Sequence, residues 1–574
     1  MIKRVIRSLS ELWNHVNNNR ILQIMILIMG VGFLLRFWGI WNAENTDEYN
    51  EVFEALRVAS GKFNLDRWHK KGYQNLLAIE YGFYFIIGYV LNVFQNPMDF
   101  AAKVVRNMEP LFIIGRFTTA TMGTASIALI YLIGQRIYNE RVGLLCAAFL
   151  AANSIHVWTS HLVNTDVPLT FFFLLSLYFV CRFYSSGKKT DYVLAAAFGA
   201  VAINVKTIGV GIGVIFILAH ILRCRREGRR VVRILYCPEI LWSFAAFVAG
   251  LIISNPPIVV GFLRFLSYHY GVYTNVSDEV PYAMGSNAYY DYIKILYREF
   301  GAPLFLVTLI GIGYGLYKRD DWDYILVAFA IGMYAILGGT TFLVQDRYLM
   351  TVFIALFLLT GRFIDDVLGK LRISRGKKAI ILTMALGVLL ASPFVTSVKF
   401  VRTLSEENTS VVSKRWIEEN IPAGSRVLLD AGRTIITFGP RINQCREKLE
   451  EQLSIIRNLK QGETYDSPLV RIVDSYSSIY FELLLKNMPE ITYDLTSTEL
   501  GRKVETPDYY KRNGYDYFIH NTDLRFRIED PVWREKYPKS AEFYDSFDKE
   551  FKLIKTFSPS ARRSGSTIQI YKIR

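Results

Sequence analysis

Cysteine is scarce in this chain, and its scarcity excludes two classes of protein. Only five cysteines occur among 574 residues, and none has a partner at a close metal-ligand spacing. A disulfide framework or a zinc cluster would need more of them. The sequence also lacks a P-loop, a G-x-G-x-x-G before a helix, an H-E-x-x-H and a G-x-S-x-G. Nucleotide, zincin and serine-hydrolase chemistry therefore have no support from motifs.

Long apolar runs are abundant. Hydrophobic residues make up 52% of the chain, the mean hydropathy is positive, and many runs approach the length of about 20 residues that spans a membrane. The first run, Ile21 to Trp41, follows a basic segment as a signal sequence would, but it is long and lacks a small-residue cleavage site. We interpret it as a retained first helix.

Membrane topology explains the formal charge of +15 better than a polyanionic partner does, and we expect no nucleic acid partner. Positive residues concentrate in short loops between apolar runs, as the positive-inside rule describes. With a cytoplasmic N-terminus, these loops all fall inside only if the run from Leu76 to Phe94 does not span. Otherwise the most basic loop, Arg223 to Arg233, would lie outside. We therefore predict an amphipathic or re-entrant helix at Leu76 to Phe94.

This threading predicts about eleven membrane spans. After the first helix they cover residues 111–135, 143–158, 168–184, 190–205, 207–222, 239–257, 302–317, 324–343, 348–364 and 379–399. From Arg402 onward the hydropathy falls and short elements follow. We expect a helix ending near Asn420, another at Tyr480 to Lys486, and strands at Arg426 to Asp430, Tyr515 to Ile519, Phe551 to Phe557 and Thr567 to Ile573.

The predicted fold class is therefore a polytopic α-helical membrane protein with a C-terminal soluble α/β domain. The transmembrane domain covers residues 1–401 and includes an external juxtamembrane loop at 42–110, and the α/β domain covers 402–574. We expect the chain in the plasma membrane, with its N-terminus cytoplasmic and its C-terminal domain extracytoplasmic. No internal repeat at a fixed short period is visible, which argues against a solenoid and gives no support for inverted transporter repeats.

Conspicuous carboxylates lie at the predicted outer ends of the spans. Asp47 and Glu48 are adjacent and follow the first span, and Asp166 lies where the chain re-enters the membrane before Pro168. Each suits the first turn of a helix, with Thr46 or Asp47 as the N-cap of the first. A carboxylate at the membrane edge can instead act as a base, because partial desolvation raises its basicity.

Lys206 interrupts a run of small residues, far from the basic loops. A cation at membrane depth normally needs an anionic partner or a polar cavity. Its partner could be Asp47, Asp166 or a phosphate supplied by a ligand.

Arginines lie on the same predicted side. Arg347 stands beside Tyr348 between two apolar runs, and Arg116 and Arg36 lie near outer helix ends. Arg347 could simply extend to the membrane interface. Guanidinium groups also bind phosphate through paired hydrogen bonds, so the set predicts a site for a lipid phosphate.

The order of these motifs resembles the GT-C membrane glycosyltransferases. An Arg-containing first helix is followed by Asp47-Glu48, by R-F-x-T-A-x-x-G at Arg116 to Gly123, and by T-D-V-P-L at Thr165 to Leu169. With Lys206 in the following hairpin, the succession is similar to the dolichyl-phosphate-mannose–protein mannosyltransferase and aminoarabinose transferase superfamily. The His-Pro-Pro or Lys-Pro-Pro element of several relatives is missing, and so is an MIR-like insertion, which favours a prokaryotic relative.

The resemblance implies transfer of a sugar from a polyprenyl-phosphate carrier to a protein, lipid or glycan acceptor on the outer face, with inversion at the anomeric carbon. The implied catalytic residues are Asp47 as the base, Glu48 beside it, and Asp166. The implied phosphate-binding residues are Lys206, Arg347, Arg116 and Tyr348. We predict no protein metal site, and a divalent metal cofactor stays open.

Two other functions compete with this one. In a transporter or flippase for a lipid-linked glycan, Lys206, Asp166 and Asp47 would form a substrate or proton site. In an anchored binding protein, the C-terminal domain would be the functional part, although the predicted spans exceed what anchoring requires.

Overall fold

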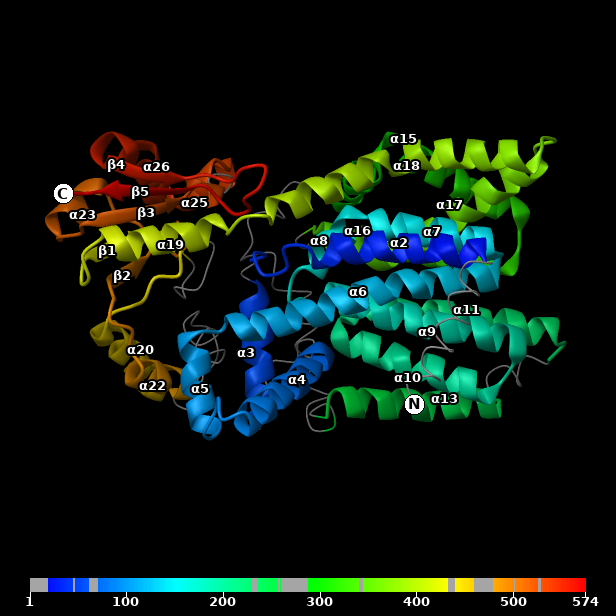
Figure 1. The fold of residues 1–574 in the computed structure, drawn as a ribbon, viewed down its shortest axis with the longest axis horizontal. Coiled ribbons are helices and arrows are strands. Elements are labelled where there is room, and N and C mark those ends of the chain that lie inside the picture. Colours follow the sequence, from blue (N-terminus) through cyan, green and yellow to red (C-terminus); the bar gives the residue numbers. More distant parts are fainter. Residues whose placement is uncertain are drawn as a thin grey trace, which may run out of the picture. The chain divides into compact units, whose positions relative to one another are not determined.

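The computed structural model describes residues 19–44, 47–60, 71–229, 236–256, 259, 287–339, 344–431, 439–458, 478–499, 501–524 and 528–574. The chain divides into two compact units (Figure 1). The first unit contains Met1–Trp38, Lys62–Leu76 and Arg116–Val401, and the second contains Gly39–Gly61, Leu77–Gly115 and Arg402–Arg574. Each unit is described by itself.

The first unit is built from apolar helices. They are α2 (Arg20–Phe37), α6 (Glu109–Ile137), α7 (Glu140–Ala152), α8 (Ser154–Ser160), α9 (Asp166–Ser186), α10 (Lys189–Val205), η1 (Thr207–Val210), α11 (Gly211–Arg226), α13 (Pro238–Ser254), α15 (Ala288–Lys318), α16 (Asp321–Gly339), η4 (Asp346–Leu349), α17 (Met350–Lys370) and α18 (Arg375–Thr403). The first turns of α6 belong to the second unit. Every predicted span falls on one or two of these helices.

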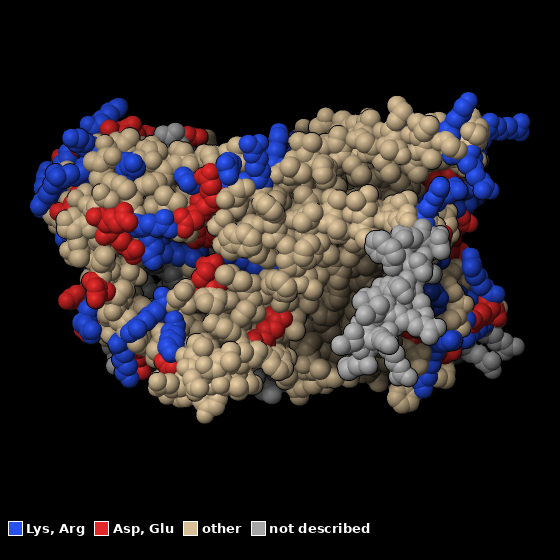
Figure 2. All heavy atoms as spheres, viewed as in Figure 1, with Lys and Arg blue, Asp and Glu red and all other residues tan. Residues whose placement is uncertain are grey.

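Seven helices of the described residues are long and apolar enough to cross a membrane, or eight if α7 and α8, which meet at a 60° bend, form one broken span. The remaining predicted spans fall on α10 and α13, which have 17 residues each, and on α17. In the first unit, the face visible in Figure 2 carries few charged side chains along the helices, and charges gather at helix ends. The predicted polytopic helical class is confirmed.

Helix α17 is deeply enclosed in the first unit. Every residue from Met350 to Gly361 is buried, because α17 packs against α7, α15 and α16. A helix that is apolar on all sides needs neighbours on all sides. Its burial holds its first residues, which follow η4, in a defined place.

Helix α4 (Lys71–Val90) occupies most of the run from Leu76 to Phe94. It is not among the described helices that meet the length and hydropathy test for a span. Large apolar side chains from its middle onward, including Ile79, Phe83 and Ile87, are more than half exposed. The non-spanning assignment stays a prediction.

The second unit contains an α/β sheet of five strands in the order β2-β1-β3-β5-β4. The strands are β1 (Arg426–Leu429), β2 (Asp494–Ser497), β3 (Tyr517–Asn521), β4 (Lys552–Phe557) and β5 (Ile568–Lys572). Strand β1 pairs in parallel with β2 and β3, whereas β5 pairs antiparallel with β3 and β4. The predicted C-terminal α/β fold is confirmed, and β2 is a strand that the sequence patterns did not predict.

Helices complete the second unit. They are α3 (Asp47–Ala59), α5 (Pro97–Arg106), α19 (Thr409–Asn420), α20 (Arg446–Asn458), α22 (Ser478–Lys486), α23 (Pro507–Arg512), η5 (Thr522–Leu524), α25 (Pro531–Lys536) and α26 (Pro538–Glu550). Thus segments from the predicted juxtamembrane loop 42–110 form one compact unit with the C-terminal part.

A buried carboxylate joins the parallel strands to α26. Asp430, which follows β1, accepts hydrogen bonds from His520 Nδ1 at 2.5 Å, Tyr544 Oη at 2.5 Å and Thr498 Oγ1 at 2.9 Å. Burial, together with the charge of Asp430, raises the pKa of Tyr544 well above its ordinary value. Three donors satisfy a carboxylate that would otherwise be costly to bury.

Candidate functional site

Asp166 and Lys206 form a buried ion pair in the first unit. Lys206 Nζ donates to Asp166 Oδ1, and the two side chains are 9% and 3% exposed respectively. Asp166 is the first residue of α9, but its own N–H donates to Asn164 Oδ1 at 3.0 Å. The Asp166 carboxylate is therefore used for ion pairing, and the partner of Lys206 among the three candidates is Asp166.

Arg347 approaches the second oxygen of the same carboxylate. Arg347 Nε lies 3.5 Å from Asp166 Oδ2 and donates to Gln345 Oε1 at 2.6 Å. Lys206 Nζ lies 4.5 Å from the ring centroid of Tyr348, a cation–π distance. The structure thus brings together four of the predicted site residues, and their charged groups are two cations and one carboxylate.

Chain connectivity explains this convergence. Helices α9 and α10 are joined by a short turn at Gly187 and pack against each other, so the first turn of α9 lies beside the last turn of α10. Lys206 follows α10 in an extended conformation, with φ −159° and ψ 134°. A Cβ at Gly209 would lie 2.7 Å from the backbone of Ala202, so this tight break requires glycine there. Irregular backbone among apolar helices is typical where a polar site is built.

A polar chain fixes η4, which carries Arg347. Asp346 accepts from the Arg347 N–H at 3.0 Å and from Arg298 at 2.9 Å. Arg298 also pairs with Glu299 at 2.8 Å, and Glu299 accepts from Ser154. Side chains of α8 and α15 therefore determine where Arg347 lies.

Arg36 does not have the phosphate-binding role that was predicted for the arginines at the outer helix ends. It is fully buried, and its guanidinium donates to Leu150 O at 2.9 Å and Ala151 O at 3.2 Å, with His156 Nδ1 at 3.0 Å. These carbonyls lie in the last turn of α7, at the bend before α8, where helix carbonyls need partners from outside the regular helix. Arg36 stabilises the bend, so we leave it out of the phosphate site.

The R-F-x-T-A-x-x-G motif packs against this arginine. A Cβ at Gly123 would lie 2.5 Å from Ser160 Oγ and 3.2 Å from Arg36 Cδ, so the glycine allows α6 to approach α2 and α8. Arg116, about two turns earlier on α6 by helix geometry, is 2% exposed. Its predicted contact with a phosphate stays a prediction.

Asp47 and Glu48 belong to the second unit. They are the first two residues of α3, where acidic side chains interact favourably with the helix dipole. Glu48 is 1% exposed and Asp47 is partly buried. The alternative cap, Thr46, lies outside the described residues. Sequence reasoning did not find Arg441 or its partner Glu44, which precedes this carboxylate pair. Arg441 also contacts Tyr49, which follows the pair.

Another polar cluster lies at the other ends of α9, α16 and α17. A cavity of about 450 Å³ there is lined by residues that include Arg136, Tyr138, Tyr184, Asp321 and Arg362. Asp323 has no exposed surface and pairs with Arg362 at 2.8 Å and with Tyr138 Oη at 2.7 Å. These side chains tie together helix ends that the threading places in the cytoplasm.

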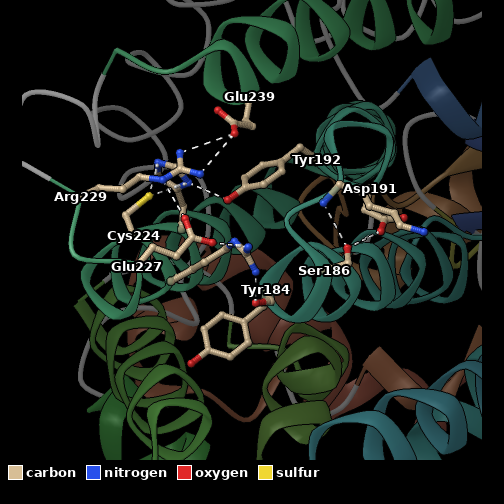
Figure 3. A network of polar contacts seen from close by, with 11 residues as sticks. Tyr184, Ser186, Asp191, Tyr192, Cys224, Glu227, Arg229 and Glu239 are labelled. Atoms are coloured by element: carbon tan, nitrogen blue, oxygen red, sulfur yellow. Dashed lines mark hydrogen bonds and ion pairs between the residues drawn. The ribbon is translucent and has the colours of Figure 1, made fainter.

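Figure 3 shows a neighbouring network at the ends of α9, α10 and α11. Arg229 pairs with Glu227 at 2.7 Å and with Glu239 at 3.4 Å, and Tyr192 Oη lies 2.8 Å from His220 Nδ1. The rest of the predicted basic loop, residues 230–233, lies outside the described residues. Within the described part of the chain, no group of three or more His, Cys, Asp and Glu side chains is placed to hold a metal ion.

This fold, with its convergent helix ends and α/β unit, resembles that of the GT-C membrane glycosyltransferases. Residues 110–254, which include Asp166 and Lys206, match the family model described as dolichyl-phosphate-mannose-protein mannosyltransferase. Comparison with curated proteins gave no match.

Solved structures share a similar fold. The chain is similar to the Archaeoglobus fulgidus oligosaccharyltransferase crystallised with Zn and sulfate, with a TM-score of 0.51 and 14% identity over 93% of this chain and 72% of that chain. It is similar to AglB from the same organism with an inhibitory peptide and a dolichol-phosphate, with a TM-score of 0.50 and 13% identity over 96% and 74%. For ArnT from Cupriavidus metallidurans bound to undecaprenyl phosphate, the values are 0.47 and 11% over 96% and 97%. The GT-C resemblance is confirmed at the level of the fold.

Proposed function

We propose that this chain is an inverting glycosyltransferase that transfers a sugar from a polyprenyl-phosphate carrier to an acceptor at the outer face of the plasma membrane. The observation that carries the proposal is the convergence of Lys206 and Arg347 on Asp166 at the ends of apolar helices. Two fixed cations next to lipid-exposed helices suit a phosphate that arrives on a lipid chain. The GT-C fold and the dolichol-phosphate in the AglB structure support the same donor class.

In the proposed reaction, Asp47 accepts the proton of the acceptor nucleophile. The nucleophile attacks the anomeric carbon from the face opposite the carrier, a new glycosidic bond forms, and the bond from carbon to phosphate oxygen breaks. The phosphate keeps the electron pair and leaves on its lipid. Lys206 and Arg347 stabilise the charge that develops on it, because preorganised cations in a water-poor site are strong electrostatic catalysts.

The acidic residue between the cations has an organising role in this proposal. Asp166 holds Lys206 and Arg347 in place before the carrier arrives, so binding requires little reorganisation. Glu48 supports Asp47, and Arg116 and Tyr348 complete the phosphate site. The acceptor is a protein, a lipid or a cell-surface glycan.

The test uses purified full-length protein in proteoliposomes with a radiolabelled polyprenyl-phosphate sugar and an extract of cell-surface acceptors. We expect labelled acceptor with the unchanged chain and a loss on the order of 100-fold or more with Asp47→Asn. Asp99→Asn, a change at a partly exposed carboxylate on α5, is the matched control. Full activity of Asp47→Asn would remove the assigned base. Movement of the carrier between leaflets without sugar transfer would favour the flippase. Mass spectrometry of the labelled product identifies the acceptor.

A further inference from the structure

Arg441, from the C-terminal part of the second unit, contacts residues on both sides of the Asp47-Glu48 pair. Arg441 Nη2 lies 2.8 Å from Glu44 Oε1, three residues before Asp47. Its guanidinium carbon lies 4.0 Å from the ring centroid of Tyr49, the residue after Glu48. Nearly four hundred residues of chain separate Arg441 from these partners, so the contact is purely tertiary.

The stacked ring of Tyr49 is itself held. Tyr49 is 8% exposed and packs edge to face on Phe112, with centroids 4.7 Å apart. The Arg441 guanidinium lies 5.8 Å from the Phe112 ring as well. Arg441 thus uses both properties of its side chain, since the edge binds a carboxylate while the face stacks on an aromatic ring.

Other contacts hold the chain leading to Asp47. Asn42 Nδ2 donates to Leu404 O at 2.9 Å, and Ser410 Oγ donates to Glu44 Oε1 at 3.4 Å. Gly39 has φ +73°, and a Cβ there would lie 2.5 Å from Leu404 Cβ. The C-terminal part therefore holds residues 39–44 at several points, and Arg441 contacts residues on both sides of Asp47.

We propose that Arg441 is a positioning residue for sugar transfer, which holds Glu44 and Tyr49 so that the Asp47 carboxylate is fixed for proton abstraction. This inference rests on the proposed function of Asp47. A displacement of about 1 Å in a catalytic group can cost about 100-fold in rate, so a residue outside the site can be decisive. The C-terminal α/β part then contributes to the reaction itself through this arginine.

The kinetic test compares Arg441→Ala with Arg441→Lys and with Glu44→Gln. We expect Arg441→Ala to lower kcat about 10- to 100-fold with little change in KM for the carrier, because the phosphate site is untouched. Arg441→Lys should recover part of the loss, since it keeps the ion pair and loses the planar stacking. Glu44→Gln and Arg441→Ala combined should cost little more than Arg441→Ala alone, as expected for partners. Arg415→Ala, which breaks an exposed pair with Glu407 at 2.7 Å on α19, is the matched control and should behave like the unchanged chain.

Hydrogen exchange of the full-length protein supplies a readout that does not depend on the reaction. Arg441→Ala should accelerate exchange in peptides covering residues 39–54, and Arg415→Ala should not. Unchanged kcat, or unchanged exchange in this segment, would overturn the inference. If Arg441→Ala does not accumulate, Glu44→Gln is measured alone, and wild-type kcat and exchange there would overturn it equally. Full activity of Asp47→Asn would instead refute the proposed function, while exchange still reports whether Arg441 holds the segment.

Discussion

Asp166 and Lys206 lie forty residues apart in the sequence and form a buried ion pair between the start of α9 and the end of α10. Arg347 lies near the other oxygen of the same carboxylate. Removing one member of a buried pair leaves an uncompensated charge, whereas removing both charges does not. Comparing the stability and activity of single and double variants therefore distinguishes a structural role of these charges from a role in sugar transfer.

Lys206→Gln is expected to destabilise the protein by roughly 3 kcal/mol and to abolish sugar transfer, because Asp166 loses its close partner. The double variant Asp166→Asn with Lys206→Gln should regain thermal stability but not transfer. Thermal unfolding in detergent and the proteoliposome assay measure the two effects. Transfer activity in the double variant would show that neither charge is needed for the reaction.

Arg347→Lys should raise KM for the polyprenyl-phosphate sugar about 10-fold, with a smaller effect on kcat. Lysine keeps the charge but loses the fork that binds two phosphate oxygens together. Lys294→Ala, at an exposed pair with Asp291 on α15, serves as the control. An unchanged KM for the carrier would exclude Arg347 from the phosphate site.

The topology predicts opposite labelling of two engineered cysteines. Ser454, on α20, and Ser374, between α17 and α18, are both exposed, and four native cysteines are buried. In a Cys445→Ser background, an impermeant maleimide added to intact cells should label Ser454→Cys. It should label Ser374→Cys only after permeabilisation. The reverse pattern would invert the orientation and move the proposed site to the cytoplasm.

The buried network around Asp430 predicts that the sheet loses folding stability at alkaline pH. Asp430→Ala should cost about 3 kcal/mol, since it leaves His520 and Tyr544 without their shared acceptor. The pKa of Tyr544 is raised in the folded state, so its stabilising contribution is full below the ordinary tyrosine pKa of about 10 and is lost as the pH rises above it. Limited proteolysis of the full chain should therefore accelerate in that range. Tyr544→Phe should be less stable at neutral pH but lose less on alkalinisation, and an identical alkaline loss would contradict this origin.

Much of the fold could be predicted because its elements are local. Each apolar run became a helix, since the length and hydropathy of a run are properties of contiguous residues. The predicted strands beginning at Arg426 and Phe551 were confirmed in the same way. Strand β2 escaped prediction because Asp494–Ser497 is short and has no apolar alternation.

Side-chain roles were harder to predict, because one residue type serves several purposes. Arg36 and Arg347 look alike as arginines near the ends of apolar runs. Packing directs Arg36 to the carbonyls that end α7 and directs Arg347 to Asp166. No local sequence pattern distinguishes an arginine that binds helix carbonyls from one that approaches a carboxylate.

The sequence by itself determined the membrane class, the positions of the helices and the small set of charged residues suited to phosphate and proton chemistry, because burial in lipid and charge are readable from composition along the chain. Only the tertiary structure decided that Lys206 pairs with Asp166 and that Arg441 flanks Asp47. These contacts join residues far apart in the chain, and their geometry follows from how whole helices and strands pack, which no local run of residues encodes.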